Sequence, residues 1–473
     1  MVDRTILAVD QGTYSTRAIV FDAKGRQLAV ARQAVELKRV SDTQVEQSPM
    51  LLLDSVRTVI RQVLADPAVA PGGITAAGIA TQRSSVVAWD RESGEPLGPV
   101  LSWQDRRAQP FIDDLAGCAA QVGTTTGLRL SAHYGGSKLH WLLQHSNRVR
   151  ETHAAGRLLM GPLASYLLFQ LLEDGPALVD HANASRTLLW NLETLDWDAD
   201  MLALFELPRE TLPACRPIEH AWGRLAGHGI PVCAVNGDQT AALYAQGEPA
   251  ADTLVVNIGT GAFVLLPTDV PRDRPAGLLA GVSRSNEACA KYYIEGTVNG
   301  AGSALKVIAD RFAVDKPADH LPGWLAAIDE PTLFINTVGG LGAPWWQAGP
   351  PAYFVRTDIC AAEALVAVIE SIVFLLQANI TLLRRHNPGV RRIRIGGGLS
   401  NLDGLCQKLA DLSGLEVHRP DQVEAAARGI AWQAAGGPAG WKTSAEGGTF
   451  APRDNPRLQQ RFTQFNAVLA SSI

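Results

Sequence analysis

The segment DQGTYST (10–16) places an acid, a glycine and three aliphatic hydroxyls between two apolar runs that have the pattern of strands. Gly12 permits positive φ, so successive backbone N–H groups can point into the turn, and Thr13, Ser15 and Thr16 add hydroxyl donors. Asp10, at the strand end, could hold a hydrated Mg²⁺. The turn therefore suits phosphate oxygens, although a tight hairpin whose hydroxyls bond their own backbone explains it equally well.

Two further glycine-bearing turns follow strand patterns later in the chain. NIGTGAFV (257–264) has glycines on both sides of Thr260, and its flanks align with those of the first turn so that Thr13 stands opposite Thr260. This match indicates an internal duplication, with two turns binding one polyphosphate. IGGGLSNLDG (395–404) is a strand ending in three glycines before a helix, which favours an anion or a flat ligand but also fits a plain packing turn. The GxxxxGK[ST] motif is absent, which excludes a Walker-type nucleotide site.

A candidate base lies in NGDQTAAL (236–243), where Asp238 begins a predicted helix. As a functional group, Asp238 would accept the proton of a substrate hydroxyl during phosphoryl transfer. Aspartate is also a favoured N-cap residue, and spacing alone favours that structural role.

Polar residues also follow the strand of ATQRSSVVAWD (80–90), where Arg83, Ser84 and Ser85 occupy a usual position for ligand contacts in α/β sheets. SWQDRR (102–107) adds Trp103, and its two arginines fit a salt-bridged surface turn better than a binding site.

Composition restricts the class of protein. The 473 residues predict two large domains, and 47% hydrophobic with 19% charged residues is typical of a globular protein. A net charge of −5 gives no basic footprint for nucleic acid. The six cysteines are scattered without a CxxC motif and the N-terminus has no signal-peptide pattern, so a cytoplasmic location is expected. The apolar segment 363–383 contains Glu363 and Glu370, which favours a buried helix over a membrane span.

Periodicity places the elements that must carry these residues. A three-stranded meander is expected over 5–33, and residues 105–225 are expected to be mostly helical. The remaining expected elements are a helix at 49–66, a strand at 74–81, a strand, turn and helix from 232, strands at 253–266 and 291–296, a long helix at 361–386, a strand at 391–398, and helices near 402–414 and 423–435.

Taken together, these motifs resemble the FGGY family of carbohydrate kinases, and most closely its glycerol kinase branch. The resemblance runs through nearly the whole chain, in family order. It is carried by LAVDQGTYSTRAIVFD, TQRSSVVAWD, SWQDRR, TTGLRLSAHYGGSKLHWLL, DHANASRTLLWNLETLDWD, NGDQTAAL, NIGTGAFVLL, YYIEGTVNGAGSALK, GGLGAPWW and GGGLSNLDGLCQKLADLSGLEVHRP.

The resemblance implies an α/β fold of two ribonuclease-H-like domains of the actin/hexokinase type, arising from an internal duplication, with the active-site cleft between them. Residues 1–240 would form the N-terminal domain, with the acceptor side and the first phosphate loop. Residues 241–473 would form the C-terminal domain, with the second phosphate loop and the adenosine region.

The resemblance also implies a role for individual residues. Asp238 becomes the catalytic base, and Asp10 the metal ligand. The positions expected to bind the acceptor are Arg83, Ser84, Trp103, His133, Asp238, Gln239 and Phe263. The positions expected to contact ATP are Thr13, Tyr14, Ser15, Gly259, Thr260, Gly302, Lys306, Gly397 and Gly398.

Several positions depart from the glycerol kinase pattern. Ser84 replaces a Glu and His133 replaces a Tyr, so two hydroxyl partners of a polyol are lost, and a buried hydroxyl left unpaired costs about 1–3 kcal/mol. Tyr14 stands where the first turn usually has a second Thr, and this phenol must either turn outward or cover the phosphates. Lys306, Leu402 and Ala182 are further departures, in place of an amide, an Asn and a Thr. The acceptor end is thus changed more than the nucleotide end.

These observations predict an ATP- and Mg²⁺-dependent kinase that phosphorylates a primary hydroxyl of a small polyol or sugar. The acceptor is either glycerol or a four- to seven-carbon ketose or sugar alcohol such as xylulose, and Ser84 and His133 favour the latter. A non-catalytic ATP- or sugar-binding regulator is the alternative from another class. The family implies a homo-oligomer, a dimer above all, and we expect neither a nucleic acid nor a membrane partner.

Overall fold

The computed structural model describes residues 5–69, 73–421, 424–441 and 447–473. Contacts between residues divide the chain into two compact units. The first comprises the described residues within 1–249, 280–292 and 424–442, and the second those within 250–279, 293–423 and 443–473. The domain boundary expected between residues 240 and 241 stays a prediction.

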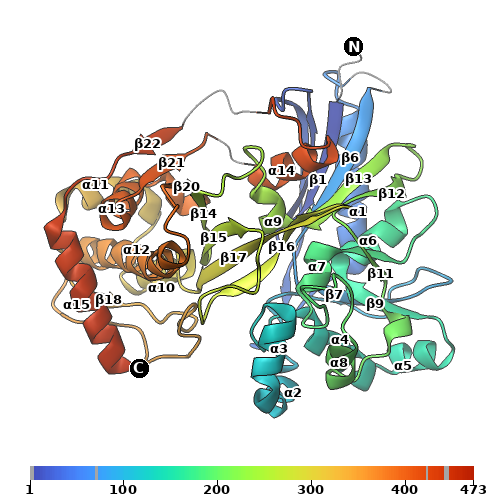
Figure 1. Cartoon of the computed structure of the whole chain (residues 1–473), viewed down its shortest axis with the longest axis horizontal. Helices are drawn as coiled ribbons and strands as arrows, with labels where there is room; N and C mark the ends of the chain where they lie inside the picture. Colours follow the sequence, from blue (N-terminus) through green and yellow to red (C-terminus); the bar gives the residue numbers. More distant parts are fainter. Residues whose placement is uncertain (1–4, 70–72, 422–423, 442–446) are drawn as a thin grey trace. The chain divides into compact units, whose positions relative to one another are not determined.

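The first unit is built on a six-stranded sheet with the order β12-β13-β6-β1-β2-β3 (Figure 1). Its strands are β1 (Thr5–Gln11), β2 (Ser15–Phe21), β3 (Gln27–Ala34), β6 (Ile74–Thr81), β12 (Glu219–Arg224) and β13 (Pro231–Gly237). The meander expected at 5–33 is confirmed, because β1, β2 and β3 pair antiparallel in sequence order. On the other side of β1, strand β6 runs parallel to it, and β13 runs parallel to β6. The carboxyl ends of β1, β6 and β13 therefore meet at one edge.

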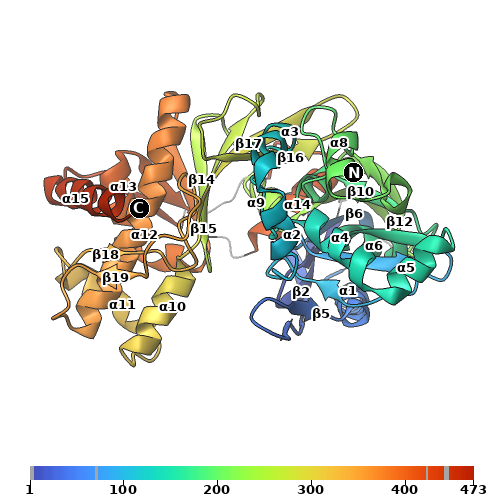
Figure 2. The ribbon, with the colours of Figure 1, turned by 90° about the horizontal axis from the view of Figure 1, so that it is seen from below.

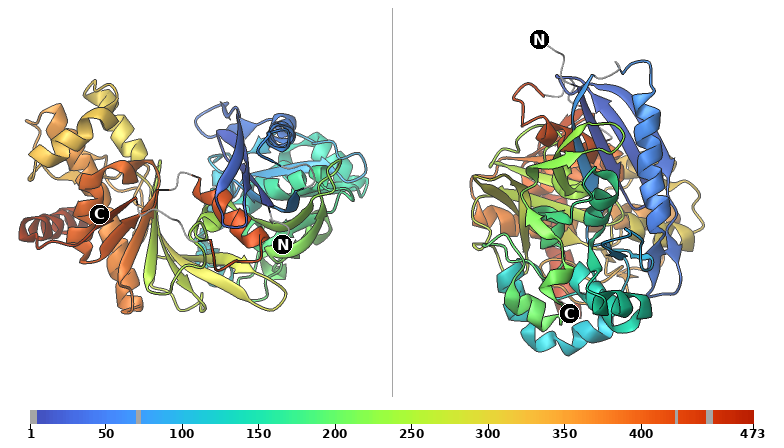
Figure 3. Two further views of the ribbon diagram at one scale, coloured as in Figure 1. Left: turned by 90° about the horizontal axis from the view of Figure 1, so that it is seen from above. Right: turned by 90° about the vertical axis from the view of Figure 1, so that its right-hand side faces the viewer.

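Helices cover both faces of this sheet. On one face, α1 (Pro49–Leu64) and α6 (Leu163–Leu171) bury their apolar residues in the same core as β1 and β2; the blue helix α1 is seen alongside the blue strands in Figure 3. On the other face, α14 (Ala425–Ala434) approaches so closely that a Cβ at Gly78 would lie 2.7 Å from the Ile430 carbonyl oxygen. Alternate residues of β6 thus face opposite layers, as the strand period requires.

The rest of the first unit has more strand than its sequence predicts. A five-stranded sheet has the order β4-β5-β8-β7-β9, and β10 pairs with β11. The bounds are β4 (Lys38–Arg39), β5 (Val45–Gln47), β7 (Val86–Asp90), β8 (Val100–Leu101), β9 (Leu158–Pro162), β10 (Leu178–Asp180), β11 (Ala214–Arg216), α2 (Gln109–Asp114), α3 (Ala119–Thr126), α4 (Gly135–His145), α5 (Asn147–Ala154), α7 (His181–Ser185), α8 (Ala199–Leu204) and α9 (Asp238–Ala242). The expectation of a mostly helical 105–225 was wrong for β9 to β12, because strands this short show too little of a period-two pattern to be recognised, and β9 is buried along its whole length.

The second sheet repeats the succession of the first. Its order is β16-β17-β15-β14-β20-β21-β22, with β14 antiparallel to β15 and parallel to β20 as β1 is to β2 and β6. The bounds are β14 (Thr253–Ile258), β15 (Ala262–Thr268), β16 (Leu279–Ser285), β17 (Ala290–Val298), β20 (Arg392–Gly396), β21 (Glu416–Arg419) and β22 (Gly448–Phe450), with β18 (Phe334–Ile335) and β19 (Tyr353–Phe354) as a separate pair. This matched succession is the structural counterpart of the duplication read from Thr13 and Thr260.

The core of the second unit is organised around α12 (Ala361–His386), which packs against α10 (Gly302–Arg311), α11 (Pro317–Ala327) and α13 (Asp403–Ser413) (Figure 2). The last helix, α15 (Pro456–Ser472), packs on α13. Within the described residues, α12 alone is long and apolar enough to cross a membrane by length and composition, and 83% of that window is buried in the structure. Glu370 is buried on it with Lys408 at 3.2 Å and Arg461 Nε at 2.9 Å. The expectation of a buried helix at 363–383 is confirmed.

Candidate active site

Asp238 and Arg83 meet at the carboxyl edge of the first sheet. Asp238 begins α9 directly after β13, and Arg83 follows the end of β6, the strand parallel to β13. Arg83 Nε lies 3.9 Å from Asp238 Oδ1, and the same guanidinium donates a hydrogen bond to Gln239 Oε1. Three residues expected at the acceptor site are thus brought together by two adjacent strands.

The structural alternative for Asp238 does not hold. Gly237 occupies the N-cap position of α9, which has no side-chain cap, and Asp238 Oδ1 instead accepts the backbone N–H of Gln239 at 2.7 Å. Burial raises the pKa of Asp238, while the charge of Arg83 opposes that rise. Because the Asp238 carboxylate lies beside the Arg83 cation and does not cap α9, it is available to accept a proton.

Asp10 is the second carboxylate at this edge. It is 6% exposed and contacts Arg17 at 3.3 Å, and Arg17 also pairs with Glu424 at 2.8 Å. Burial and the neighbouring charge of Asp238 raise the pKa of Asp10 to about 7. A single carboxylate such as that of Asp10 suits Mg²⁺, which binds proteins through one or two carboxylates when most of its ligands are waters and phosphate oxygens. Among the described residues no group of three or more metal-binding side chains occurs.

The first turn, between β1 and β2, is closed by the Gly12 N–H, which donates to the Ser15 carbonyl oxygen at 3.0 Å. The expected use of positive φ at Gly12 was wrong, because this hydrogen bond closes the turn without a left-handed residue at that position. Ser15 is buried, whereas the side chain of Tyr14 is 62% exposed. The phenol is therefore not packed into the core of the first unit.

Ser84 adopts an unusual conformation in the expected acceptor region. Its φ is +63°, a left-handed backbone that costs a non-glycine residue free energy and often marks a functional position. Ser84 is 3% exposed, and its Oγ has no hydrogen-bond partner among the residues that the structure describes. Its carbonyl oxygen accepts a hydrogen bond from Lys138 Nζ at 3.2 Å. The backbone of Ser84 is thus held by Lys138, while its buried hydroxyl has no partner among the described residues.

His133 lies in the same region. Its ring packs edge-on against Trp103, with ring centroids 5.7 Å apart, and its carbonyl oxygen accepts a hydrogen bond from Lys138 Nζ. Burial, and then the charges of Lys138 and Arg106, lower the pKa of His133 well below its usual range. A neutral imidazole has one donor and one acceptor nitrogen, both suited to sugar hydroxyls.

Trp103 connects this region to the first turn, because its Nε1 donates to Thr13 Oγ1 at 2.9 Å. All ten expected site residues of the first unit are thereby located near one edge: Asp10, Thr13, Tyr14, Ser15, Arg83, Ser84, Trp103, His133, Asp238 and Gln239.

In the second unit, the turn between β14 and β15 packs on the start of α10. Gly302 N–H donates to the Gly259 carbonyl oxygen at 2.9 Å, and Ser303 N–H donates to that of Thr260 at 3.0 Å. A Cβ at Gly302 would lie 2.7 Å from the Gly259 oxygen, so the close approach requires glycine. Gly259 and Thr260 are exposed, and the Gly259 N–H donates to the Gly261 carbonyl oxygen at 2.8 Å, which closes this turn as Gly12 closes the first.

The other expected residues of the second unit are more spread out. Gly397 has φ +91° and its Cβ position lies 2.4 Å from Asn257 Oδ1, so only glycine fits beside the end of β14. Gly398 is exposed at the start of the following turn. Lys306 pairs with Asp310 at 2.9 Å on the exposed side of α10, and Phe263 is half-buried on β15.

Sequence reasoning missed Lys138, which is fully buried on α4. Its Nζ donates to three backbone oxygens, those of Ser84, His133 and Tyr134. A lysine within the otherwise apolar pattern SKLHWLL was the available signal, because a buried lysine needs several partners.

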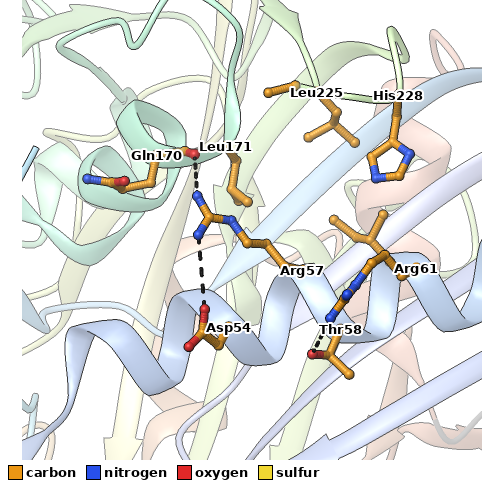
Figure 4. A pocket seen from close by; sticks show the side chains of 10 residues that line it. Asp54, Arg57, Thr58, Arg61, Gln170, Leu171, Leu225 and His228 are labelled. Carbon is orange, nitrogen blue, oxygen red and sulfur yellow. Dashed lines mark hydrogen bonds and ion pairs between the residues drawn. The ribbon is translucent and has the colours of Figure 1, made fainter.

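A separate cavity of about 530 Å³ lies in the first unit, between α1, the end of α6 and the turn after β12 (Figure 4). Arg57 and Arg61 project into it from α1, toward Gln170 and Thr58 respectively, and His228 lies across from them. No residue expected at the active site lines it.

Comparison with known proteins identifies the relatives of this chain. Residues 5–245 match the N-terminal domain, and residues 254–436 the C-terminal domain, of the FGGY family of carbohydrate kinases. A glycerol kinase from Synechocystis sp. is 31% identical over 92% of this chain and 91% of its own. Another, from Delftia acidovorans, is 33% identical over 91% of this chain and 89% of its own.

Solved structures share the fold. A Plasmodium falciparum glycerol kinase with ADP superposes with a TM-score of 0.89 at 22% identity, covering 100% of this chain and 98% of that one. A ligand-bound xylulose kinase from Lactobacillus acidophilus gives 0.85 at 20% identity, covering 99% and 97%. The expected two-domain α/β fold is therefore confirmed.

Proposed function

Because the chain belongs to the FGGY family of carbohydrate kinases, we propose that it transfers the γ-phosphate of ATP to a primary hydroxyl of a small polyol or sugar. The observation that carries this proposal is the contact of Arg83 with both Asp238 and Gln239 at the strand edge that also bears Asp10. Phosphoryl transfer needs positioning, charge stabilisation and one base, and this cluster supplies all three.

In the proposed reaction, Asp238 accepts the proton of the acceptor hydroxyl as its oxygen attacks the γ-phosphorus. Arg83 orients Asp238 and donates to the acceptor, and the Thr13 and Thr260 turns donate to phosphate oxygens. Gly302, Gly397 and Gly398 let the backbone of the second unit approach the nucleotide. Mg²⁺ held through Asp10 would neutralise phosphate charge when bound. We expect this chemistry to take place in the cytoplasm, in a homo-oligomer.

For the acceptor, we favour a ketose or sugar alcohol of four to seven carbons over glycerol. Ser84 offers a short side chain with a buried hydroxyl that is still available, and His133 offers a neutral ring. Both leave more room, and provide different hydrogen bonds, than the Glu and Tyr of the glycerol kinase branch. The glycerol kinase relatives, at 31–33% identity, favour glycerol as the competing candidate.

The test is acceptor-stimulated ADP release by the purified protein with Mg-ATP. The panel comprises glycerol, D-xylulose, L-ribulose, D-fructose, xylitol, ribitol and D-gluconate. We expect the highest kcat/KM with a ketose or sugar alcohol. Highest kcat/KM with glycerol would overturn the acceptor assignment alone, and no stimulation by any member would overturn the kinase proposal.

A further inference from the structure

A closed ring of hydrogen bonds connects the first turn, between β1 and β2, to residues of three other segments of the first unit. The Trp103 backbone N–H donates to Ser85 Oγ at 3.0 Å, and Ser85 Oγ donates to Gln82 Oε1 at 2.9 Å. Gln82 Nε2 donates to Gln47 Oε1 at 2.9 Å, and Gln47 Nε2 donates to the Thr13 carbonyl oxygen at 2.9 Å. Trp103 Nε1 donates to Thr13 Oγ1 at 2.9 Å, which closes the ring. Every donor and acceptor in it is chemically consistent.

The ring is shielded from water. Ser85, Gln82 and Gln47 are 0%, 2% and 3% exposed. Gln82 Nε2 also donates to Gln11 Oε1 at 3.2 Å, and Gln47 Nε2 to the Glu36 carbonyl oxygen at 3.2 Å. Because buried amides without partners are costly, these side chains have little freedom to move independently of one another.

Its members come from separate parts of the chain. Thr13 lies in the turn after β1, Gln47 ends β5, Gln82 and Ser85 lie between β6 and β7, and Trp103 follows β8. Gln47 is the one of these that bridges the first turn and the β6–β7 segment through a single side chain. The segment that it holds includes Arg83 and Ser84.

The ring also determines the direction of the Thr13 hydroxyl. An indole N–H is only a donor, so Thr13 Oγ1 must accept from Trp103, and its own hydrogen is then free to donate elsewhere. The Thr13 carbonyl oxygen is held by Gln47. Thr13 is therefore fixed at both ends, with one hydrogen available for a ligand oxygen.

We propose that Gln47 is a positioning residue that holds the Thr13 turn and the Arg83–Ser84 segment in one geometry, so that the sites for phosphate and for acceptor are formed together. This inference rests on the proposed function, in which Thr13 contacts phosphate and Arg83 the acceptor. Gln47 touches neither substrate and acts through Thr13 and Gln82.

The test compares Gln47→Met, which removes both hydrogen bonds at similar volume, with Gln47→Glu, which keeps the oxygen facing Gln82 but loses the donor to Thr13. The matched control is Gln170→Met, which removes a hydrogen bond to the Gly94 carbonyl oxygen elsewhere in the first unit. Binding of Mg-AMP-PNP is measured by calorimetry, and KM for ATP and for the best acceptor of the panel by ADP release.

We expect Gln47→Met to raise the AMP-PNP Kd and both KM values by about fivefold, the size of one or two lost hydrogen bonds. Gln47→Glu should raise the Kd but retain more of the acceptor affinity, and Gln170→Met should change neither, even if its Tm falls. A Gln47→Met enzyme with Kd and both KM values within twofold of wild type would overturn the proposal.

A double-mutant cycle of Gln47→Met with Trp103→Phe tests whether the hydrogen bonds of the ring act cooperatively or whether Gln47 and Trp103 position Thr13 independently. If the ring acts as a unit, the two substitutions together should raise the AMP-PNP Kd by less than the product of their separate factors. Strict multiplicativity would overturn the proposal. This readout needs no acceptor, so a wild type that binds AMP-PNP but phosphorylates nothing refutes the proposed function while the cycle still decides on the ring. A wild type that does not bind AMP-PNP refutes both.

Discussion

Arg83 reaches Asp238 across the surface of a glycine. Its Nε lies 3.9 Å from Asp238 Oδ1, and its stem passes over Gly237, where a Cβ would lie 2.4 Å from Arg83 Cδ and 2.5 Å from Cγ. Gly237 has φ −74°, a conformation open to any residue, so the glycine is required by space rather than by backbone geometry. The contact between the proposed base and its cationic neighbour depends on this missing side chain.

Gly237→Ala should therefore displace Arg83 while leaving the strand intact. Because the shifted guanidinium no longer orients Asp238 and Gln239, we expect kcat/KM for the acceptor to fall roughly 10–100-fold, the cost of a misplaced catalytic group. Steady-state kinetics by ADP release measure this. Gly117→Ala, at a position with no atom within 4 Å of the added methyl, is the control, and an equal loss in both variants would contradict the prediction.

Asp238→Asn tests the base directly. The amide keeps the shape of the carboxylate but cannot accept the hydroxyl proton, so kcat should fall by about 10²–10⁴-fold. The Kd for Mg-AMP-PNP should stay within about threefold, because the base does not hold the nucleotide in the proposed roles. Asp54→Asn, an exposed acid on α1, serves as the comparison. Turnover close to wild type in Asp238→Asn would assign the base to another residue.

The position of Asp238 could be predicted from the sequence, whereas its surroundings could not. An apolar strand ending in NGDQ before a helix places a carboxylate at a sheet edge, and β13 and α9 lie there. Sequence alone ranked the N-cap role above catalysis, since it carries no information on which oxygen meets which N–H. Gly237 takes the cap position and also contacts Arg83, a residue remote in sequence that local patterns do not bring beside it.

In the acceptor region, too, the sequence indicated candidate residues but not their conformation or contacts. Ser84 and His133 were recognisable as departures from a family pattern, but the left-handed backbone of Ser84 depends on the strands on either side of it. Lys138 was hidden because burial with three carbonyl partners depends on loops that the sequence does not bring together. Tyr14 was undecided from sequence, and its exposed ring is a property of the turn that Gly12 and Ser15 close.

Lys138→Met tests whether Lys138 holds the segment at Ser84 and the segment at His133–Tyr134 in place together. Lys138 Nζ is 3.2 Å from the Ser84 oxygen and 3.1 Å from that of Tyr134, and it also donates to His133. Without this donor the segments at Ser84 and at His133–Tyr134 lose the side chain that contacts both, so KM for the acceptor should rise roughly tenfold, on the scale of one or two lost hydrogen bonds. The Kd for Mg-AMP-PNP should change less than KM for the acceptor.

A second variant separates positioning from mere loss of stability. Lys138→Gln retains a shorter donor and should recover part of the acceptor affinity even if its Tm is no higher than that of Lys138→Met. If acceptor KM simply follows Tm across wild type and both variants, Lys138 has a role in stability alone.

Acid sensitivity of folding should originate in part from His181. It is 6% exposed at the start of α7, and burial lowers its pKa from 6.5 to about 4. Below pH 6.5 the unfolded chain therefore binds a proton that the folded chain does not, and stability falls until about pH 4. The pKa difference corresponds to roughly 3 kcal/mol at most.

His181→Leu removes this contribution of His181 to acid unfolding, so its Tm should fall less than that of the wild type between pH 7.5 and 4.5. The Tm difference at pH 7.5, where neither state carries the proton, measures the packing effect of the substitution alone. Parallel Tm curves for the two proteins over this range would show that His181 contributes nothing to acid unfolding.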